Sequence, residues 1–121
     1  MRSGSGRLAG RRILVVEDDF MIAQLMAAAF RAGGAEIVGP AGTVKDALAL
    51  VAGEERIDGA VLDVNLRGEM VYPVADLLQA KDVSIVFMTG YGKSDIVPRF
   101  ADRPCLQKPV SVERLIQALF G

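Results

Sequence analysis

The sequence predicts an α/β fold in which a doubly wound sheet of five parallel strands has helices on both faces. Three observations predict it: short apolar runs alternate with segments of helical periodicity, the runs are apolar at nearly every position, and glycines and prolines mark the joins. Runs that are apolar on both faces indicate a parallel sheet that is covered on each side. Short right-handed crossovers then favour the flavodoxin-like strand order 2-1-3-4-5.

Five apolar runs are too short for helices of ordinary length and suit strands. We expect them to be the first to fifth strands of the sheet, in chain order. They are Arg12–Glu17, Glu36–Val38, Ala60–Asp63, Ser84–Thr89 and Pro104–Gln107.

Four segments between or after these runs have apolar residues at helical spacing. The first helix should end before Gly33-Gly34, and the second should begin after the capping residue Thr43. The third should open at Pro73, and the last should follow Ser111. The apolar stripes are Ile22, Leu25, Met26 and Ala29 in the first helix, Val44, Ala47, Leu48 and Val51 in the second, Val74, Leu77 and Leu78 in the third, and Val112, Leu115, Ile116 and Leu119 in the last.

Between the fourth and fifth strands the helical pattern fails. Gly90, Gly92, Pro98 and Pro104 leave room for an irregular or short fourth helix at most. This segment, up to Arg103, has the least packing to lose, so we expect it to be the moving part of the molecule.

The length of 121 residues suits one domain with a real core, and we expect a disordered leader over residues 1–11 and the domain over 12–121. The hydrophobic share of 51% and the charged share of 24% are those of an ordinary globular protein. The longest apolar stretch, residues 20–30, is too short to span a bilayer, and the leader has no secretion signal. The single cysteine, Cys105, is compatible with the reducing cytoplasm, where we expect the protein.

The net charge of −1 is unevenly distributed along the chain. The first twelve positions hold four of the 14 basic residues and no acid, which leaves 10 basic against 15 acidic residues in the remainder. A folded body of negative charge binds nucleic acid poorly. We therefore expect neither nucleic acid nor a membrane among the partners.

Polar residues stand where the expected strands end, at the edge where open α/β sheets bind their ligands. The first and third strands are neighbours in the order 2-1-3-4-5, so the acids that follow them should meet beside this switch point. The residues at these strand ends are Glu17, Asp18, Asp63, Thr89 and Lys108.

Three carboxylates in one crevice repel one another, and without a counter-charge at least one should bind a proton. Mg²⁺ removes this repulsion, because it takes a few carboxylate oxygens and keeps waters that a phosphoryl oxygen can replace. Lys108 adds a mobile positive charge, and Thr89 adds a hydroxyl that can donate to a phosphoryl oxygen. The set predicts phosphoryl transfer to the carboxylate of Asp63.

Four segments resemble the signature segments of bacterial response-regulator receiver domains, the CheY-like superfamily. They are Ile13–Asp19, Val61–Leu66, Phe87–Tyr91 and Gln107–Pro109, in the family's order and over nearly the whole chain. The Phe-Met-Thr-Gly-Tyr letters of the third segment further resemble the alphaproteobacterial FAT GUY subfamily. Its members are mostly single-domain receivers that are associated with HWE-type sensor kinases and have an irregular fourth helix.

The resemblance implies a role for each matched residue, with Mg²⁺ as the cofactor. Asp63 would be the phosphorylation site and a metal ligand, Glu17 and Asp18 the acidic metal pair, the backbone carbonyl of Asn65 a further metal ligand, Thr89 the switch hydroxyl, and Lys108 the lysine that bridges to the phosphoryl group.

Two positions depart from the family pattern. Many receivers have Asp where this chain has Glu17, a change that should preserve metal binding with altered reach. Most receivers have an aromatic residue three positions before the lysine that rotates inward on activation, and this chain has Cys105 there. We expect Tyr91 to substitute for that aromatic, and Asp19 simply to begin the first helix.

The chain contains no histidine, so the phosphoryl donor must come from outside it. We expect a sensor histidine kinase, of the HWE type among others, a phosphotransfer protein, or a small acyl phosphate. Because the last expected helix ends at Gly121, output should come through phosphorylation-dependent protein contact or by acting as a phosphate sink. The chain would phosphorylate and dephosphorylate itself and would not be a turnover enzyme.

Two alternatives stay open at this point. The fold could serve as a docking module that works without phosphorylation. The Asp63-Val-Asn65 segment also resembles the Asp-x-Asp motif of haloacid-dehalogenase-like phosphohydrolases, although their second Asp is Asn here and no cap segment encloses a substrate.

Overall fold

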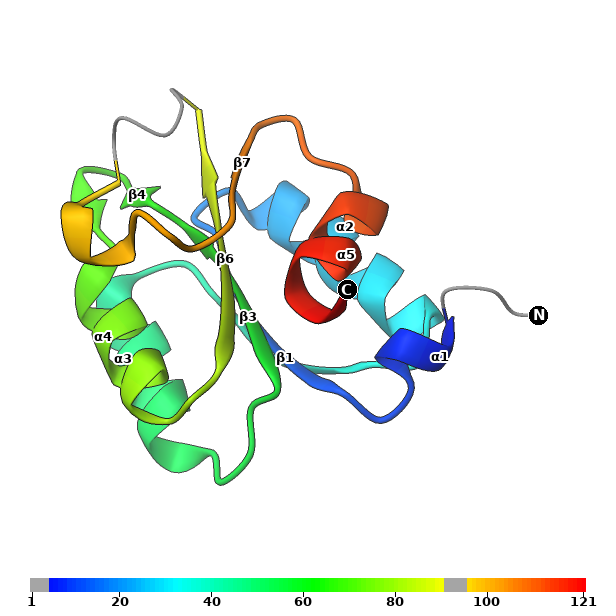
Figure 1. The fold of residues 1–121 in the computed structure, drawn as a ribbon. Coiled ribbons are helices and arrows are strands. Elements are labelled where there is room, and N and C mark those ends of the chain that lie inside the picture. Colours follow the sequence, from blue (N-terminus) through cyan, green and yellow to red (C-terminus); the bar gives the residue numbers. More distant parts are fainter. Residues whose placement is uncertain (1–4, 91–95) are drawn as a thin grey trace.

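The computed structural model describes residues 5–90 and 96–121, which form a sheet between two helical layers (Figure 1). The five strands of this sheet run in the order β2-β1-β3-β6-β7, and every neighbouring pair is parallel. Counted along the main sheet this is the order 2-1-3-4-5, so the predicted fold class is confirmed. The strands are β1 (Arg12–Val16), β2 (Glu36–Ala41), β3 (Gly59–Asp63), β6 (Ser84–Thr89) and β7 (Cys105–Gln107).

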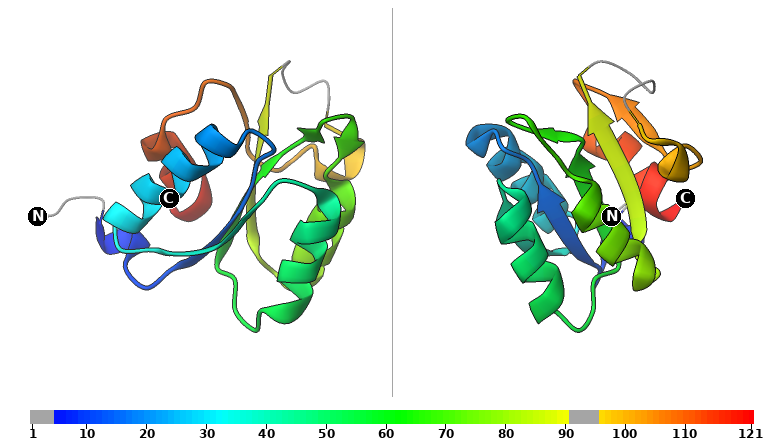
Figure 2. Two further views of the ribbon diagram at one scale, coloured as in Figure 1. Left: turned by 180° about the vertical axis from the view of Figure 1, so that it is seen from behind. Right: turned by 90° about the vertical axis from the view of Figure 1, so that its left-hand side faces the viewer.

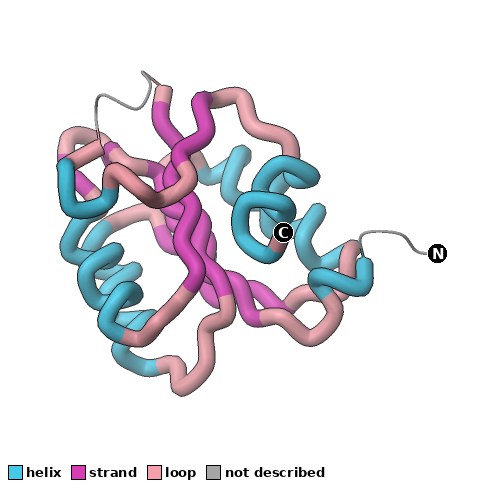
Figure 3. The backbone as a smooth tube through the Cα atoms, in the orientation of Figure 1, coloured by secondary structure: helices cyan, strands magenta, loops and turns pink. Residues whose placement is uncertain are grey.

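Helices cover both faces of the sheet, as Figures 1 and 2 show from three directions. The tube in Figure 3 shows the strands as a central layer between these two groups of helices. Within the described ranges, none of the helices has both the length and the apolar character that a bilayer crossing requires. One face carries α1 (Ser5–Leu8), α2 (Phe20–Ala32) and α5 (Val112–Phe120), and the other carries α3 (Val44–Gly53) and α4 (Tyr72–Ala80).

Alternate residues of each strand serve the two cores, as the period of two in a strand requires. In β1, Leu14 and Val16 belong to the core beneath α3 and α4. Ile13 and Val15 belong to the core beneath α2 and α5. Because β3 is the central strand, all five of its residues are buried.

The second strand is longer than predicted and runs to Ala41. It passes through Gly39 and Pro40, residues that usually end a strand. The sheet tolerates both here because β2 lies at the edge of the sheet, where one side needs no backbone partner. The backbone at Gly39 has φ of +96°, a conformation that suits glycine.

The buried stripe predicted for the first expected helix, which is α2 in the structure, is mostly wrong. Of its four residues only Met26 is buried, whereas Leu25 and Ala29 face solvent. The face that packs on the sheet is shifted by about one residue, because the small side chains of Ala23 and Ala27 let α2 approach closely. The stripes predicted for α3, α4 and α5 lie on the packed sides of those helices.

The end of the expected leader takes a defined place, in contrast to the disorder expected over residues 1–11. The side chain of Leu8 is 2% exposed and fills the space beside Gly33, where a Cβ atom would clash with it. The guanidinium of Arg7 donates to the carbonyl oxygen of Gly121 at 2.8 Å. Residues 5–11 therefore pack against the ends of α2 and α5.

Between β6 and β7 the described residues contain one 3₁₀ turn, Pro98–Phe100. This agrees with the prediction of an irregular or short helix in this position. Tyr91 and the other residues of the 91–95 segment lie outside the described residues, so the role expected of Tyr91 stays a prediction. The 3₁₀ turn is anchored by Phe100, whose ring is fully buried in the core beneath α4.

Candidate functional site

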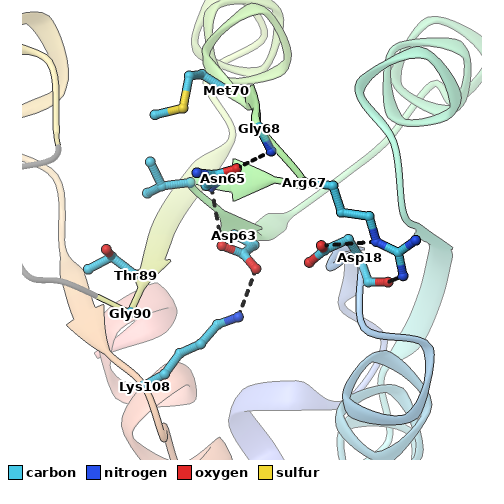
Figure 4. Close-up of a pocket in the computed structure, with 10 residues that line it drawn as sticks. Asp18, Asp63, Asn65, Arg67, Gly68, Met70, Thr89, Gly90 and Lys108 are labelled. Carbon is cyan, nitrogen blue, oxygen red and sulfur yellow. Dashed lines mark hydrogen bonds and ion pairs between the residues drawn. The ribbon is translucent and has the colours of Figure 1, made fainter.

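The carboxyl edge of the sheet brings the predicted site residues to one crevice. Asp63 ends β3 and Thr89 ends β6, while Glu17 directly follows β1 and Lys108 directly follows β7. These strand ends meet because β1, β3, β6 and β7 are neighbours in the sheet. The crevice contains a cavity of about 580 Å³ (Figure 4), lined by Asp18, Asp63, Val64, Asn65, Arg67, Gly68, Met70, Thr89, Gly90 and Lys108.

Lys108 connects two of the acids. Its Nζ atom donates to Oδ2 of Asp63 at 2.7 Å and lies 3.0 Å from Oε1 of Glu17. The side chain of Glu17 is completely buried and that of Asp63 is 8% exposed, so both carboxylates depend on this ammonium for compensation. Burial is the largest influence on the pKa of Lys108 and lowers it, but the bonds to Asp63 and Glu17 together outweigh burial and raise the pKa above its ordinary value.

The carboxylate of Glu17 is the least exposed to solvent of the three acids. Burial raises the pKa of its carboxyl above the ordinary value, and the backbone N–H of Asp19 and the Lys108 ammonium oppose this rise without cancelling it. Repulsion from Asp63 raises the pKa further. The residues predicted to repel one another therefore do so, although desolvation is the larger cause.

The three carboxylates fit a hard divalent cation. One oxygen from each of Glu17, Asp18 and Asp63 lies within 4.8 Å of the others. Within the described part of the chain, the buried Oε1 of Glu17 has no hydrogen bond of good angular geometry, although the Lys108 ammonium lies 3.0 Å from it. Oxygen donors of this kind, incompletely satisfied by the protein, are the ligands that Mg²⁺ prefers.

A small hairpin follows Asp63 and forms one wall of the crevice. It consists of β4 (Asn65–Leu66) and β5 (Glu69–Met70), which pair antiparallel. The backbone N–H of Asn65 donates to Oδ1 of Asp63 at 3.3 Å, and Oδ1 of Asn65 accepts the N–H of Gly68 at 2.6 Å. Asn65 therefore links the orientation of the Asp63 carboxylate to the turn of the hairpin.

Arg67 is a residue of the crevice that the sequence analysis missed. Its Nε lies 3.4 Å from Oδ2 of Asp18, and its Nη2 donates to the backbone oxygen of Asp18 at 3.4 Å. It occupies the turn of the hairpin, and only the folded hairpin directs its side chain across the crevice (Figure 4). The letters Arg67-Gly68 offered one signal, a two-residue turn between short runs.

The hydroxyl-bearing Thr89 is buried, at 3% exposed, and lines the same cavity as Asp63 and Lys108. Asp19 caps α2, since its Oδ1 accepts the N–H of Ile22 at 3.0 Å, as expected for a residue that begins the helix. Cys105 is half-buried and packs against the core that contains Phe87 and Phe100.

An aromatic cluster lies in the core beneath α4, on the side of the sheet that Cys105 contacts. The ring of Tyr72 lies 6.1 Å from that of Phe87 and 6.0 Å from that of Phe100. The hydroxyl of Tyr72 accepts the backbone N–H of Val97 at 3.2 Å. The start of α4 is therefore bonded directly to the segment that precedes the 3₁₀ turn.

Apolar side chains are exposed beside the acids, at the start of α2. Phe20 is 76% exposed, Met21 is 69% exposed and Leu25 is 66% exposed. Phe20 also lines a small hollow together with Glu17 and Asp18. Three large exposed apolar side chains on one helix end are more than the isolated ones that any protein surface carries.

Comparisons with known proteins agree with this geometry. A family model described as the response regulator receiver domain matches residues 13–120. The solution structure of SdrG from Sphingomonas melonis Fr1 is similar, with 42% sequence identity and a TM-score of 0.78 over 93% of this chain and 94% of that one. The structure of the BeF₃-activated conformation of SdrG, from Pseudomonas melonis Fr1, has 41% identity and a TM-score of 0.76 over 93% of this chain and 98% of that one.

A curated relative extends beyond the matched region. The transcriptional regulatory protein PdtaR of Mycobacterium tuberculosis is 32% identical over 113 residues, which cover 90% of this chain and 55% of PdtaR. The chain thus spans about half the length of that relative.

Proposed function

Because this chain belongs to the response-regulator receiver domain family, we propose that it accepts a phosphoryl group on Asp63 from the phosphohistidine of a partner protein. The observation that carries the proposal is the position of the Asp63 carboxylate. It lies 2.7 Å from the Lys108 ammonium and within 4.8 Å of oxygens of Glu17 and Asp18. Family membership supports the role of a phosphoacceptor in two-component signalling. The roles of the individual residues are what we propose.

The side chains divide the chemistry among them. A carboxylate oxygen of Asp63 attacks phosphorus, the phosphorus–nitrogen bond of the donor breaks, and the electron pair leaves with the imidazole. Lys108, which already contacts Asp63, pairs with a phosphoryl oxygen of the product, and the buried hydroxyl of Thr89 donates a hydrogen bond to another. Glu17, Asp18, Asp63 and the carbonyl of Asn65 would hold Mg²⁺, which when bound neutralises phosphoryl charge.

The surface beside the crevice supports a protein as the donor. Phe20 lines a hollow together with Glu17 and Asp18, and Met21 and Leu25 are exposed on the same helix, where a docked partner would cover them. We propose a sensor histidine kinase, the HWE type included, or a phosphotransfer protein. Phosphorylation then acts through protein contact or as a phosphate sink in the cytoplasm, and the protein turns over no other substrate.

The direct test is labelling of Asp63→Asn with a phosphorylated histidine kinase in the presence of Mg²⁺. We expect the wild type to take up the label and the variant to take up none, since an amide cannot form the acyl phosphate. Asp82→Asn is the matched control, because Asp82 is an exposed residue after α4, at the other end of the strands. Labelling of Asp63→Asn at the wild-type level would remove Asp63 from the reaction.

A second readout needs no kinase. Beryllofluoride imitates the phosphoryl group, and the BeF₃-activated conformation of the relative SdrG supports its use here. Titration with beryllofluoride at saturating Mg²⁺ should move the backbone NMR signals of residues around Asp63, Thr89 and Lys108. The Asp63→Asn variant should show no such movement. A phosphorylation-independent docking module would leave the wild-type signals in place as well.

A further inference from the structure

Arg67 brings a second cation to the crevice, from the side opposite Lys108 (Figure 4). The two cations are held differently. Lys108 donates at 2.7 Å to a nearly buried carboxylate, whereas the side chain of Arg67 is 79% exposed and meets Asp18 at 3.4 Å through both of its contacts. Two long contacts on an exposed side chain contribute little free energy. Arg67 is therefore free to exchange Asp18 for another anion.

A second arginine on the same protein shows what a firm pair looks like. Nε and Nη2 of Arg99 donate to the two oxygens of Asp76 at 2.9 Å each, the two-pronged geometry that suits a guanidinium and a carboxylate. The bond to Arg99 lowers the pKa of Asp76 below its ordinary value. Arg67 has no comparable pairing with Asp18, although both arginines stand at the surface.

The backbone of the hairpin does not require an arginine. Arg67 has φ of +55° and Gly68 has φ of +92°, so both central residues of the turn are left-handed. Asn or Gly adopts this conformation at a lower cost than a long side chain does. A residue that is unfavourable for the turn and directed across the crevice indicates a use for its charge.

Charge counting shows what that use is. The crevice holds three acids, Glu17, Asp18 and Asp63, and the two cations Lys108 and Arg67, for a net charge of −1. A divalent cation would bring this to +1 in the presence of Arg67 and to zero without it. An incoming phosphoryl group carries about two negative charges at neutral pH. The charge of Arg67 thus decides whether the crevice, with a divalent cation bound, is positive and attracts such a group.

We propose that Arg67 pairs with Asp18 in the protein without a bound cation. When a divalent cation binds the carboxylates, the Arg67 side chain moves to the phosphoryl group. The proposal rests on the proposed function of Asp63. It assigns two opposite effects to one side chain: Arg67 competes with the cation for Asp18, and it then attracts the anionic donor. With acetyl phosphate as donor, an oxygen of Asp63 bonds to phosphorus, the bond from phosphorus to the bridging oxygen breaks, and acetate leaves with the electron pair. Arg67 contacts the non-bridging oxygens, so it takes part in binding and in charge stabilisation.

The first arm of the test measures Mg²⁺ alone, with no phosphoryl donor. Arg67→Gln keeps an unbranched polar side chain, although a shorter one, and a similar backbone cost in the turn, but removes the charge. We expect its Kd for Mg²⁺, measured by NMR titration at low ionic strength, to be about threefold to fivefold lower than that of the wild type. Arg67→Lys should bind Mg²⁺ nearly as the wild type does. Arg31→Gln, an exposed arginine in the last turn of α2, is the control.

The second arm measures the rate of phosphorylation by acetyl phosphate at saturating Mg²⁺. We expect Arg67→Gln to react about fivefold more slowly than the wild type, and Arg67→Lys to recover most of the rate. Tighter Mg²⁺ binding with slower phosphorylation supports the proposal, because damage to the fold would weaken both. Equal Mg²⁺ affinity and equal rate in Arg67→Gln and Arg31→Gln overturn it, as does weaker Mg²⁺ binding in Arg67→Gln.

The two arms also separate this proposal from the function on which it rests. A wild type that neither acetyl phosphate nor a phosphorylated kinase labels would overturn the role of Asp63 and the phosphoryl contact of Arg67. A labelled wild type with an unaltered Arg67→Gln variant would overturn the role of Arg67 alone.

Discussion

The two edges of the sheet both carry charged residues and arrange them in different ways. At the amino edge, Arg12 lies 2.5 Å from Glu36, contacts Glu54 and donates to the carbonyl of Arg56 at 2.9 Å. All of these side chains are partly exposed. Each of the acids Glu36, Glu54 and Asp58 meets Arg12 or Arg56, so no acid of these pairs lacks a cation.

The carboxyl edge is unbalanced, and two of its acids are more deeply buried than any at the amino edge. Three acids share Lys108 and the loosely held Arg67, and two of the acids are almost completely buried. Ion pairs that are exposed to solvent suit an edge whose role is structural. Each contributes little to the free energy of unfolding and costs little in desolvation. Buried carboxylates in excess are unfavourable by themselves, and they are what the proposed binding of a cation and a phosphoryl group requires.

Removal of the partly buried cation, Lys108, should have the largest effect on this contrast. Lys108→Met leaves Glu17 and Asp63 without their ammonium, so we expect the free energy of unfolding at pH 7 to fall by about 2 to 3 kcal/mol and labelling to be lost. Urea denaturation with and without Mg²⁺ measures the first effect, and Mg²⁺ should restore part of the loss. Lys45→Met, at an exposed position of α3, is the control, and an equal loss there would contradict the prediction.

Addition of a divalent cation should have the next largest effect. Mg²⁺ at ten times its Kd should stabilise the wild type by about 1.4 kcal/mol, because it binds the folded state alone. Thermal denaturation with Mg²⁺ or with EDTA measures this difference. Glu17→Gln should lose most of the gain, whereas Glu36→Gln at the amino edge should keep it. A gain of the same size in both variants would place the cation elsewhere.

The pH dependence of stability should reveal Glu17 with a smaller effect. Its pKa in the folded protein is raised above 4.5, so above that pH the folded state holds a proton that the unfolded state has already released. Stability from this group is therefore present at low pH and is lost as pH rises from 4.5 through the raised pKa. Denaturation across this range in EDTA should show the decline in the wild type and a flatter profile in Glu17→Gln. A wild type that gains stability relative to the variant as pH rises would contradict it.

A substitution at the amino edge should have the smallest effect on stability and on Mg²⁺ binding. Arg12→Gln removes partly exposed pairs with Glu36 and Glu54, so the free energy of unfolding should fall by at most about 1 kcal/mol. Its Kd for Mg²⁺ should equal that of the wild type within the error of an NMR titration. A change in Mg²⁺ affinity would show that the two edges are coupled through β1.

The strand ends could be predicted from the sequence because parallel topology allows few outcomes. Once five apolar runs are placed in one parallel sheet, the residues after each run must meet at the same edge. Asp63, Thr89 and Lys108 were therefore located without any side-chain coordinate. The starts of two helices could also be predicted, because they depend on residues close together in the sequence. Thr43 accepts the N–H of Asp46 at 3.1 Å, and Ser111 accepts that of Arg114 at 3.3 Å.

Features that depend on tertiary contacts were beyond sequence reasoning. The first helix is apolar around much of its circumference, so its periodicity does not show which side packs on the sheet. The burial of Leu8 depends on the space beside Gly33, which is 25 positions away in the chain. Arg67 reaches Asp18 only because the hairpin turns back over the crevice, an arrangement that no run of letters displays.

The contact between Arg7 and the carbonyl of Gly121 has a consequence for how the domain can be joined to others. It holds Arg7, near the start of the described chain, against its last residue, beside α5, whereas the carboxylates lie at the carboxyl ends of the strands. Chain ends that lie close together at the surface tolerate fusion and circular permutation. A second protein module attached at either end would therefore leave the mouth of the crevice open to a docking kinase.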